Sequence, residues 1–420
     1  MYYIADLHVH SHYAYATSKD LDLERLYQWA CIKGIHVVGT GDFTHPQWFE
    51  TLQQQLVPDG NGLYRLQHPP APAWPHDAMD IRFCLSTEVS CLYKHADQWR
   101  KNHLLIYAPD MATVAKLNAK LATHGNLAAD GRPTLRLSAR DLLEIVLETS
   151  SRAHLIPAHL WTPWFSTLGS KGGYDCVEAC FRDLTPHIFA LETGLSSDPA
   201  MNRQCSQLDR YTMVSNSDAH SPCNLGREAT LFDTALTYDA MFDALKMKVG
   251  WLGTFEFFPE EGKYYMDGHR RCGVCLHPET TQQHQGLCPV CKCPLTPGVL
   301  HRVRTLADRH TTGSIAEGAP CTYLVPLMQI IAQLKGMGVR THGVRREYQR
   351  LIGLFGNEFK LLTDVSIDQI AQRLGRVYAE AIRRLRAGQV KRVPGYDGVY
   401  GQVHIFQPEE LAAAHQPGLF

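Results

Sequence analysis

The chain has 420 residues, 45% of them hydrophobic and 10% aromatic, which is typical of a folded protein and too long for one ordinary core, so we expect two or three domains. A formal net charge of −1 excludes a nucleic-acid surface spread over the whole protein, so any such surface must be local. No apolar run reaches the roughly 18 residues of a membrane-spanning helix, and the 13 cysteines follow no secretory signal. We therefore expect an intracellular protein that does not enter a membrane.

The first 250 residues alternate short apolar strands with amphipathic helices. Ser138 is placed to cap one helix and Pro199 to begin another. Seven strands alternating with helices predict a parallel α/β sheet, most simply a barrel. The expected strands end at His8 and lie at 37–40, 83–86, 103–107, 155–158, 189–191 and 213–215, and the expected helices span 23–33, 111–123, 138–150, 199–210 and 238–248.

Histidines and carboxylates gather at these strand ends. His8 and His10 share one face of an extended strand, because side chains alternate between its two faces. In a parallel barrel the reactive groups lie at the carboxyl ends of the strands, although His103 begins its strand. The further candidates are Asp42, His45, Glu88, His159, Glu192, Asp218 and His220.

A mixed set of imidazoles and carboxylates suits two or three zinc, manganese or iron ions, whereas an all-oxygen set would suit magnesium or calcium. We expect two or three divalent metals in the barrel, with zinc, manganese and magnesium as the main candidates. Clustered divalent metals stabilise phosphoryl displacement and activate water. Nucleophile-elbow, P-loop and Rossmann glycine patterns are missing from the sequence, so hydrolysis of a phosphate ester is the expected reaction.

The segment 160–173 directly follows His159 and contains Trp161, Trp164 and Lys171. Its aromatic rings could stack on a nucleobase while its lysine contacts a phosphate. A packed lid whose aromatic residues belong to the core explains the same composition. The sequence leaves both interpretations open.

Two Cys-x-x-Cys pairs, Cys272/Cys275 and Cys288/Cys291, are separated by 12 residues. Pairs at this spacing can converge on one tetrahedral zinc, and four thiolates would make the site structural. A redox-active dithiol is the alternative, but it would not explain the second pair. The pattern also predicts a small zinc-dependent module.

The last third of the chain has mainly helical patterns, and its basic residues outnumber its acidic ones. Basic clusters on a helical domain fit contact with a phosphate backbone, although a solvated charged face is the simpler reading. We predict a barrel over 1–262, a zinc module over 263–299 and a basic helical domain over 300–420. The main basic candidates are Arg302, Arg304, Arg340, Arg345, Arg346, Arg350, Arg383, Arg384, Arg386, Lys391 and Arg392.

The ordered motifs resemble those of the PHP superfamily, whose name stands for polymerase and histidinol phosphatase. The resemblance rests on Asp6-x-His8-x-His10, Gly41-Asp42, Glu88, His103, Pro157-Ala158-His159 and Ser217-Asp218-Ala219-His220. It implies a distorted (β/α)7 barrel. It also implies one metal on His8, His10, Glu88 and Asp218, a second on His103, His159 and the shared Glu88, and a third position served by Asp42 or His45 with His220.

Further motifs narrow the resemblance to the endonuclease Q family over nearly the whole chain. They include Ala16-Thr17-Ser18-Lys19, the segment 39–46, Trp161-Thr162-Pro163-Trp164-Phe165, both cysteine pairs, Leu300-His301-Arg302-Val303 and the turn-rich segment 394–401. The resemblance implies a DNA repair endonuclease that cuts 5′ to uracil, hypoxanthine, xanthine or an abasic site.

On this reading Asp218, His10 and Glu88 are central to catalysis, and the lesion is flipped out of the duplex. The expected DNA contacts are Trp161, Trp164, Lys171, Arg302 and Tyr396. We expect a cytoplasmic, nucleoid-associated monomer, for which a sliding clamp is a possible but unindicated partner. The alternative is a PHP-type phosphatase or exonuclease acting on a small phosphate ester or a DNA end.

Overall fold

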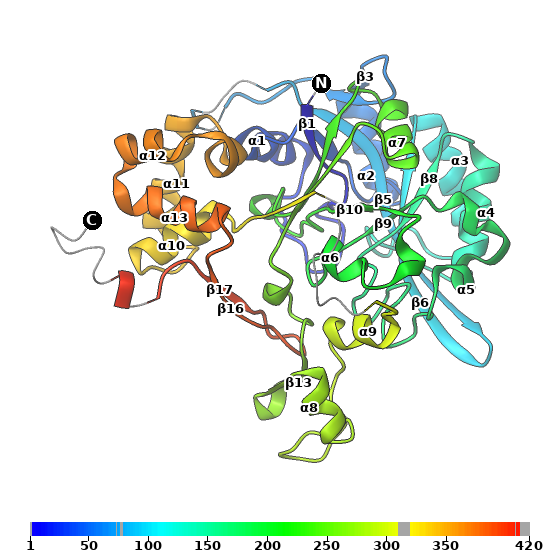
Figure 1. Ribbon diagram of the computed structural model, residues 1–420. Helices are drawn as coiled ribbons and strands as arrows, with labels where there is room; N and C mark the ends of the chain where they lie inside the picture. Colours follow the sequence, from blue (N-terminus) through cyan, green and yellow to red (C-terminus); the bar gives the residue numbers. More distant parts are fainter. Residues whose placement is uncertain (1, 73, 76–78, 310–319, 408, 412–420) are drawn as a thin grey trace.

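The computed structural model describes residues 2–72, 74–75, 79–309, 320–407 and 409–411. Figure 1 shows a large α/β unit, a small module below it and a group of helices on the opposite side from α3 to α5. None of the described helices is both long and apolar enough to cross a membrane. The α/β class, the cysteine-containing module and the helical C-terminal region are thus as the sequence predicts.

The main sheet contains both parallel and antiparallel pairs, so the prediction of a wholly parallel sheet is wrong. The strands β1 (Tyr2–Asp6), β2 (Val37–Gly39) and β5 (Arg82–His95) are parallel neighbours. Antiparallel pairs join β1 to β11 (Ala229–Asp233), β11 to β12 (Trp251–Glu256), β5 to β6 (Gln98–Ala108), and β6 to β8 (His154–Pro157). The strands β9 (Ala190–Glu192) and β10 (Thr212–Val214) form a separate parallel pair. The short strand β4 (Tyr64–Leu66) pairs with β5 on one side and with the edge strand β3 (Leu56–Pro58) on the other, and β7 (Thr134–Leu135) pairs with β5 alone among the described strands.

The prediction that His103 begins its strand is wrong, because β6 starts at Gln98 and His103 lies within it; the direction of β6 explains how His103 still reaches the site. In the antiparallel pairing His103 lies opposite Ser90 of β5, and the adjacent Leu104 lies opposite Pro157 of β8. The early part of β6 therefore reaches the same end of the sheet as Glu88 and His159. A parallel β6 would carry His103 to the opposite end.

The predicted helices of this unit form with small changes at their ends. Ser138 caps α4 (Ala139–Thr149) by accepting the Asp141 N–H, as expected. The helix expected over 199–210 is interrupted: α6 (Pro199–Asn202) is followed by a short 3-10 turn, Ser206–Leu208. The other helices are α1 (Leu23–Lys33), α2 (Pro46–Gln55), α3 (Met111–Leu121), α5 (Val177–Phe181) and α7 (Tyr238–Met247).

The small module contains β13 (Asp267–His269), β14 (Val274–Leu276) and α8 (Pro278–Gln283), and α9 (Val299–Leu306) follows it. Its buried core consists of Val274, Cys288 and Leu295 alone. So small an apolar core is typical of a module that depends on a bound metal.

The helical region contains α10 (Leu327–Lys335), α11 (His342–Phe355), α12 (Ile367–Leu374) and α13 (Arg376–Arg386), with a π-helical turn over Lys360–Asp364. It is joined to the α/β unit by β15 (Cys321–Tyr323), which pairs with β12, and by a buried ion pair of 2.8 Å between Lys33 of α1 and Glu358.

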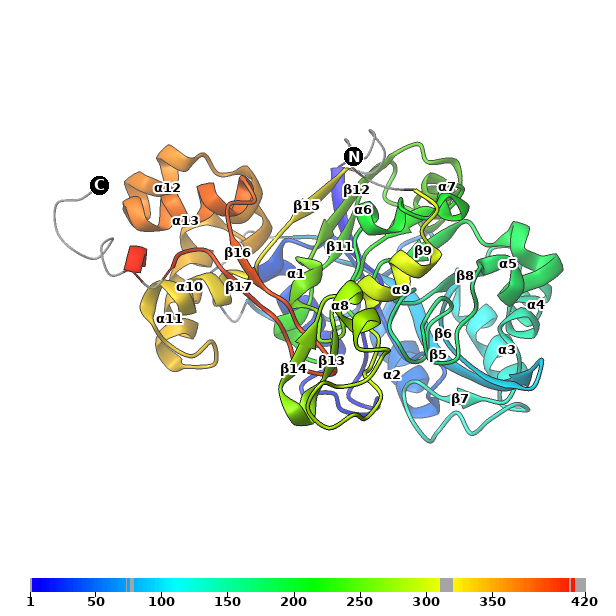
Figure 2. The same cartoon turned by 60° about the horizontal axis from the view of Figure 1, so that its bottom comes forward.

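The hairpin of β16 (Lys391–Val393) and β17 (Gln402–His404) runs back from the helices toward β13 (Figure 2). Between its strands, Tyr396 makes a backbone bridge with Met266. Because the chain returns from the helical region to the small module, each region is built from more than one stretch of sequence. The boundaries at 262 and 299 therefore remain predictions.

Candidate metal centres and the cavity above them

One cluster of potential ligands consists of His8, His10, Glu88 and Asp218, whose ligand atoms all lie within 4.8 Å of one another. The Asp218 Oδ1 atom lies 3.1 Å from His10 Nε2 and 3.5 Å from His8 Nε2. The His8 Nε2 atom is buried and has no hydrogen-bond partner among the described residues. An imidazole nitrogen without a hydrogen-bond partner, together with the two carboxylates that it faces, provides donor atoms that suit a transition metal.

A second cluster shares Glu88 with the first. Glu88 Oε1 lies 2.9 Å from His103 Nδ1 and 3.0 Å from His159 Nε2, while Glu88 Oε2 faces the first cluster at 3.4 Å from His10 Nε2. The two oxygens of one buried carboxylate thus face different ligand groups. This arrangement fits two divalent cations bridged by Glu88.

The charges around the second cluster favour the forms that bind a metal. Burial alone would raise the pKa of Glu88, but His103, Arg132 and His8 together hold it well below its usual value. Burial lowers the pKa of His103 to about 4, although Glu88 opposes the shift. A carboxylate and a neutral imidazole are therefore present at neutral pH, and these are the protonation states that coordinate a cation. In the first cluster burial opposes protonation, but the carboxylates, Glu192 beside His8 and Asp42 beside His10 foremost, raise the pKa of both histidines well above its usual value, so a cation bound there would displace protons.

Two further carboxylates orient the histidines from behind. Glu192 accepts a hydrogen bond from His8 Nδ1 at 3.0 Å and from the His159 backbone N–H at 2.8 Å. Asp42 accepts from His10 Nδ1 at 3.0 Å. A proton held on Nδ1 leaves the Nε2 lone pair of each ring free for a metal.

The predicted role of Asp42 as a direct metal ligand therefore does not fit the structure. Its second oxygen accepts from both the backbone N–H and the hydroxyl of Ser11, each at 2.6 Å. His45 lies outside both clusters and stacks on Tyr13 at 4.2 Å between ring centroids. His220 is closer, with Nδ1 3.5 Å from Asp218 Oδ1, but it completes no group either. The described residues assemble two clusters and do not assemble the third position.

The backbone is strained at the site. Asp42, His159 and Asp218 have positive φ angles of 49°, 29° and 46°. Residues other than glycine rarely adopt such angles, which cost on the order of 1–3 kcal/mol each and are concentrated at functional sites. The strain aims all three side chains inward from the turns that follow their strands.

Arg132 is outside the predicted site, and Glu192, a predicted member of the metal-binding set, belongs to neither cluster and lies behind His8 and His159. Arg132 lies in the connection between α3 and β7, and its Nη1 donates to Glu88 Oε2 at 3.0 Å. A loop arginine carries no periodic signal, so it could not be found from the strand ends. The position of Glu192 after a strand was the available signal for its role.

A cavity of about 490 Å³ opens above the clusters. His103, His159, Asp218 and His220 line its inner part, and an aromatic and cationic rim lines its mouth. In the rim, Trp164 meets Tyr264 edge-on at 5.4 Å, and the Lys263 Nζ lies 5.5 Å from the Tyr264 ring and 5.8 Å from the Tyr400 ring. We refer to Trp164, Lys263, Tyr264 and Tyr400 as the rim.

The predicted DNA contacts fare differently. Trp164 belongs to the rim, and Lys171 is exposed. Trp161 is a correction: it is 1% exposed and donates its Nε1–H to Asn202, so it is a core residue. Arg302 is a second correction, because its guanidinium donates to the Leu168 and Tyr174 carbonyls and to Asp175.

Tyr396 is half-buried against the small module, where its ring lies close to the α-carbon of Gly268. The neighbouring Tyr400 is the tyrosine that reaches the cavity mouth, and 59% of its surface is exposed. The turn-rich segment 394–401 thus reaches the cavity through Tyr400 and not through Tyr396, whose contact with DNA stays a prediction.

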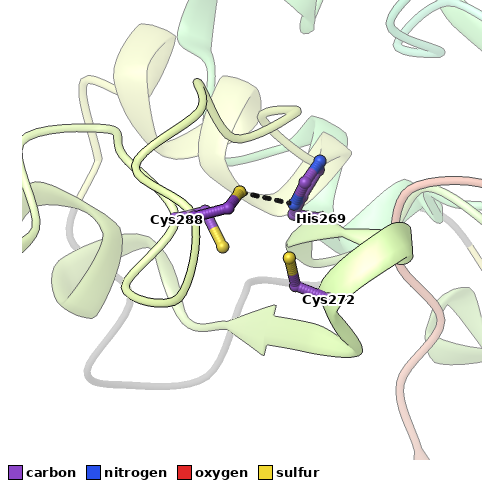
Figure 3. A group of neighbouring side chains, drawn as sticks. His269, Cys272 and Cys288 are labelled. Carbon is purple, nitrogen blue, oxygen red and sulfur yellow. Dashed lines mark hydrogen bonds between the residues drawn. The ribbon is translucent and has the colours of Figure 1, made fainter.

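The zinc-type cluster also differs from the predicted four cysteines. Cys272, Cys288 and Cys291 converge with His269, and all four ligand atoms lie within 4.8 Å of one another. His269 Nδ1 is 3.4 Å from Cys291 Sγ, and Figure 3 shows the histidine facing the sulfur atoms. Cys275 lies outside the group; it sits in β14, where it pairs with Gly268.

A signal for His269 was present in the sequence. His269-x-x-Cys272-Gly273 has the same two-residue spacing as Cys288-x-x-Cys291, and Gly273 has a positive φ of 65° that a tight metal-binding turn uses. A hydrogen bond from the Cys293 backbone N–H, helped by hydrogen bonds from neighbouring cysteine side chains, lowers the pKa of Cys291 to about 7, which favours a thiolate. Three sulfurs and one imidazole make a closed set suited to structural zinc.

Comparison with other sequences finds matches over different parts of the chain. Residues 326–389 match the family model of the MJ0043 C-terminal domain. The uncharacterised protein MJ0043 of Methanocaldococcus jannaschii is 29% identical over 261 residues, which are 60% of this chain and 32% of that protein, so the chain matches about a third of its length. The uncharacterised protein YqxK of Bacillus subtilis is 26% identical over an alignment of 428 residues, covering 95% of this chain and 98% of that protein.

Two solved structures match almost the whole chain. The lesion-specific endonuclease PfuEndoQ from Pyrococcus furiosus superimposes with a TM-score of 0.83 at 29% identity, covering 98% of this chain and 99% of the other. An endonuclease Q bound to a 27-mer duplex with an abasic lesion at the active site superimposes with a TM-score of 0.84 at 30% identity, covering 98% of each chain. With this identity, this coverage and two ligand clusters sharing one carboxylate, the chain belongs to the endonuclease Q family.

Proposed function

We propose that this protein is a metal-dependent endodeoxyribonuclease that cuts the phosphodiester bond 5′ to deaminated bases and abasic sites. The observation that carries the proposal is the pair of ligand clusters sharing Glu88 at the floor of a cavity with an aromatic and cationic rim. A metal pair suits phosphodiester hydrolysis, and such a rim suits a nucleic acid. The similarity to an endonuclease Q whose structure contains a duplex with an abasic lesion also supports the proposal.

Divalent cations bound at the two clusters would withdraw charge from the phosphate and lower the pKa of a coordinated water. The role of the chain is to hold the ligands in place. Glu192 and Asp42 fix the rings of His8 and His10 and keep their Nε2 lone pairs directed at the clusters. Glu88, whose two oxygens face different clusters, would be a ligand shared by both.

The proposed reaction gives a 3′-hydroxyl and a 5′-phosphate. The oxygen of one water forms a bond to phosphorus, and the bond from phosphorus to the 3′ oxygen breaks. The water loses a proton, and the leaving 3′ oxygen gains one. Fixed positive charge in the cavity stabilises the additional negative charge on the phosphoryl oxygens as the bonds change.

The depth of the clusters requires the lesion to leave the duplex. Glu88, His8 and His10 are at most 1% exposed, so a base-paired strand has no direct access to them. Flipping a nucleotide costs a few kcal/mol and costs least where the base is mispaired or missing. Trp164 and Tyr400, which are 38% and 59% exposed, are available to stack on the opened strand.

DNA binding also requires a phosphate-contacting surface. Several predicted arginines are engaged within the protein: Arg304 pairs with Glu279, and Arg383 pairs with Glu380. Arg345 and Arg346 are exposed on α11 and are better placed for a phosphate backbone. The affinity for DNA should fall steeply as salt increases, because each phosphate contact releases counterions.

The test is incubation with 5′-labelled duplexes carrying one uracil, one hypoxanthine or one abasic site, with zinc, manganese or magnesium added. We expect one nick 5′ to each lesion, none in the matched undamaged duplex, and none after chelation. Asp218→Asn should abolish the nick while leaving DNA binding nearly intact. Wild-type nicking by Asp218→Asn would refute the assignment of the clusters.

The same experiment separates the alternative activities. A phosphatase or exonuclease on the same site would release phosphate from a small ester, or would shorten the labelled strand from its end without regard to the lesion. Either product pattern in place of a unique internal nick would replace the proposed function.

A further inference from the structure

We propose that Arg132 is a catalytic residue that binds the scissile phosphate and supplies the fixed positive charge that a third metal would otherwise provide. The inference rests on the proposed function and goes beyond it, because it assigns a phosphate ligand and predicts that the barrel holds two metals.

The side chain lies where the substrate phosphate must arrive. The guanidinium contacts Glu88 Oε2 at 3.0 Å on the side of the first cluster, and Arg132 also lines the cavity. Its side chain is 21% exposed, which leaves part of the guanidinium facing the cavity.

The backbone around Arg132 is anchored to the barrel. Asp130 Oδ1 accepts from the Arg132 N–H at 2.9 Å and from the Tyr15 N–H at 3.2 Å. The Gly131 N–H donates to the Tyr13 carbonyl at 3.0 Å, and the Pro133 carbonyl accepts from the Ser90 N–H at 2.9 Å. The connection is thus tied to the segment after β1 on one side and to β5 on the other.

Gly131 brings this connection against Asp42. A β-carbon at position 131 would lie 2.4 Å from Asp42 Oδ2, so only glycine permits the approach. The same carboxylate accepts from His10 and Ser11. Asp42 therefore orients His10 and is not available to a third metal. The close approach of Gly131 to Asp42 places the next residue, Arg132, near the two clusters, where its guanidinium supplies a positive charge.

A guanidinium is suited to this task. Its planar N–H groups bind two oxygens of a phosphate together, and its charge is insensitive to pH. Arginines that meet a phosphoryl group in its transition state raise rates by about 10³–10⁵ where they are the main charge supplied. Beside two metals the contribution should be smaller, about 10²–10³, comparable to one oxyanion donor.

The rival explanation is that Arg132 only balances the charge of Glu88. In that case its loss would alter the stability or the metal content of the protein and would leave the rate of the metal-loaded enzyme unchanged. The two explanations therefore differ in the rate constant, in the metal content and in whether an added cation restores activity.

The experiment compares Arg132→Ala and Arg132→Lys with Arg136→Ala, an exposed arginine on the same segment. Single-turnover cutting of an abasic duplex gives the rate, and metal analysis of each purified protein gives the stoichiometry. We expect Arg132→Ala to lose about 10²–10³ in rate, Arg132→Lys to recover part of it, and Arg136→Ala to match wild type.

We also expect guanidinium at a low, non-denaturing concentration to restore part of the Arg132→Ala rate, while each protein keeps two barrel metals and one zinc. A wild-type rate for Arg132→Ala, a loss of barrel metal in that variant, or three barrel metals in wild type would overturn the inference. Absence of cutting by the wild-type protein would instead overturn the proposed function, so the two failures are distinguishable.

Discussion

Replacing His269 should remove the structural zinc, whereas replacing Cys275 should not. His269→Ala takes one of four ligands from a group whose ligand atoms lie within 4.8 Å of one another, and Cys275→Ser changes a thiol outside that group. A structural zinc site needs all four positions to be closed. We therefore expect the zinc content to fall from one equivalent toward zero in His269→Ala and to stay near one in Cys275→Ser.

The magnitude follows from the size of the module core. Val274 and Leu295 are 9% and 4% exposed, and burying each contributes about 1.5–3 kcal/mol. Binding of structural zinc contributes about 10–16 kcal/mol. The metal thus outweighs the apolar core of the module severalfold, so its loss should unfold the module locally while the α/β unit keeps its structure.

The assay combines metal analysis with limited proteolysis. His269→Ala should be cleaved rapidly within residues 267–297, and wild type and Cys275→Ser should resist. His269→Cys is the matched control, because a thiolate at this position restores a four-ligand set. Loss of zinc in Cys275→Ser with retention in His269→Ala would refute the reasoning and restore the four-cysteine assignment.

Three other changes test the surroundings of the sites. Glu192→Gln should weaken barrel metal binding by about 10–100-fold, because the carboxylate that orients His8 is lost; unchanged affinity in a chelator competition would contradict this. Glu358→Gln should leave Lys33 buried without its counter-charge and cost about 3–5 kcal/mol in denaturant unfolding, and an unchanged free energy of unfolding would contradict this. Burial raises the pKa of Glu261 to about 8, so the protonated form is favoured in the folded state, and its stabilising effect is complete below about pH 4 and lost as the pH rises through 8. Glu261→Gln should therefore reduce the fall in melting temperature as the pH rises from 5 to 8. The exposed control Glu148→Gln should leave the pH dependence of the melting temperature unchanged.

Much of the barrel site could be predicted because its signals are local. His8 and His10 share one face by alternation, and His159 and Asp218 follow apolar strands, whereas Glu88, predicted to follow a strand, lies within β5. Helix ends were equally readable: Ser138 caps α4, and α1 spans the expected residues. These features depend on neighbours within a few positions, so the sequence states them directly.

Other assignments failed where two residues carried the same local signal. Asp42 follows a strand like a ligand does, but its oxygens are directed to His10 and Ser11. Trp161 and Trp164 stand three residues apart, and only the second reaches the cavity. A pattern identifies the kind of side chain, but the direction of that side chain depends on segments that pack against it.

The sequence by itself determined the α/β class, the supply of imidazoles and carboxylates at the strand ends, and the presence of a metal-binding cysteine module. Only the tertiary structure decided that β6 runs antiparallel, that His269 and not Cys275 lies with Cys272, Cys288 and Cys291, and that Arg132 reaches Glu88 from a loop. The physical reason is that residue type and spacing are properties of the chain, whereas the meeting point of several donor atoms is fixed by strand direction and by contacts between residues far apart in sequence.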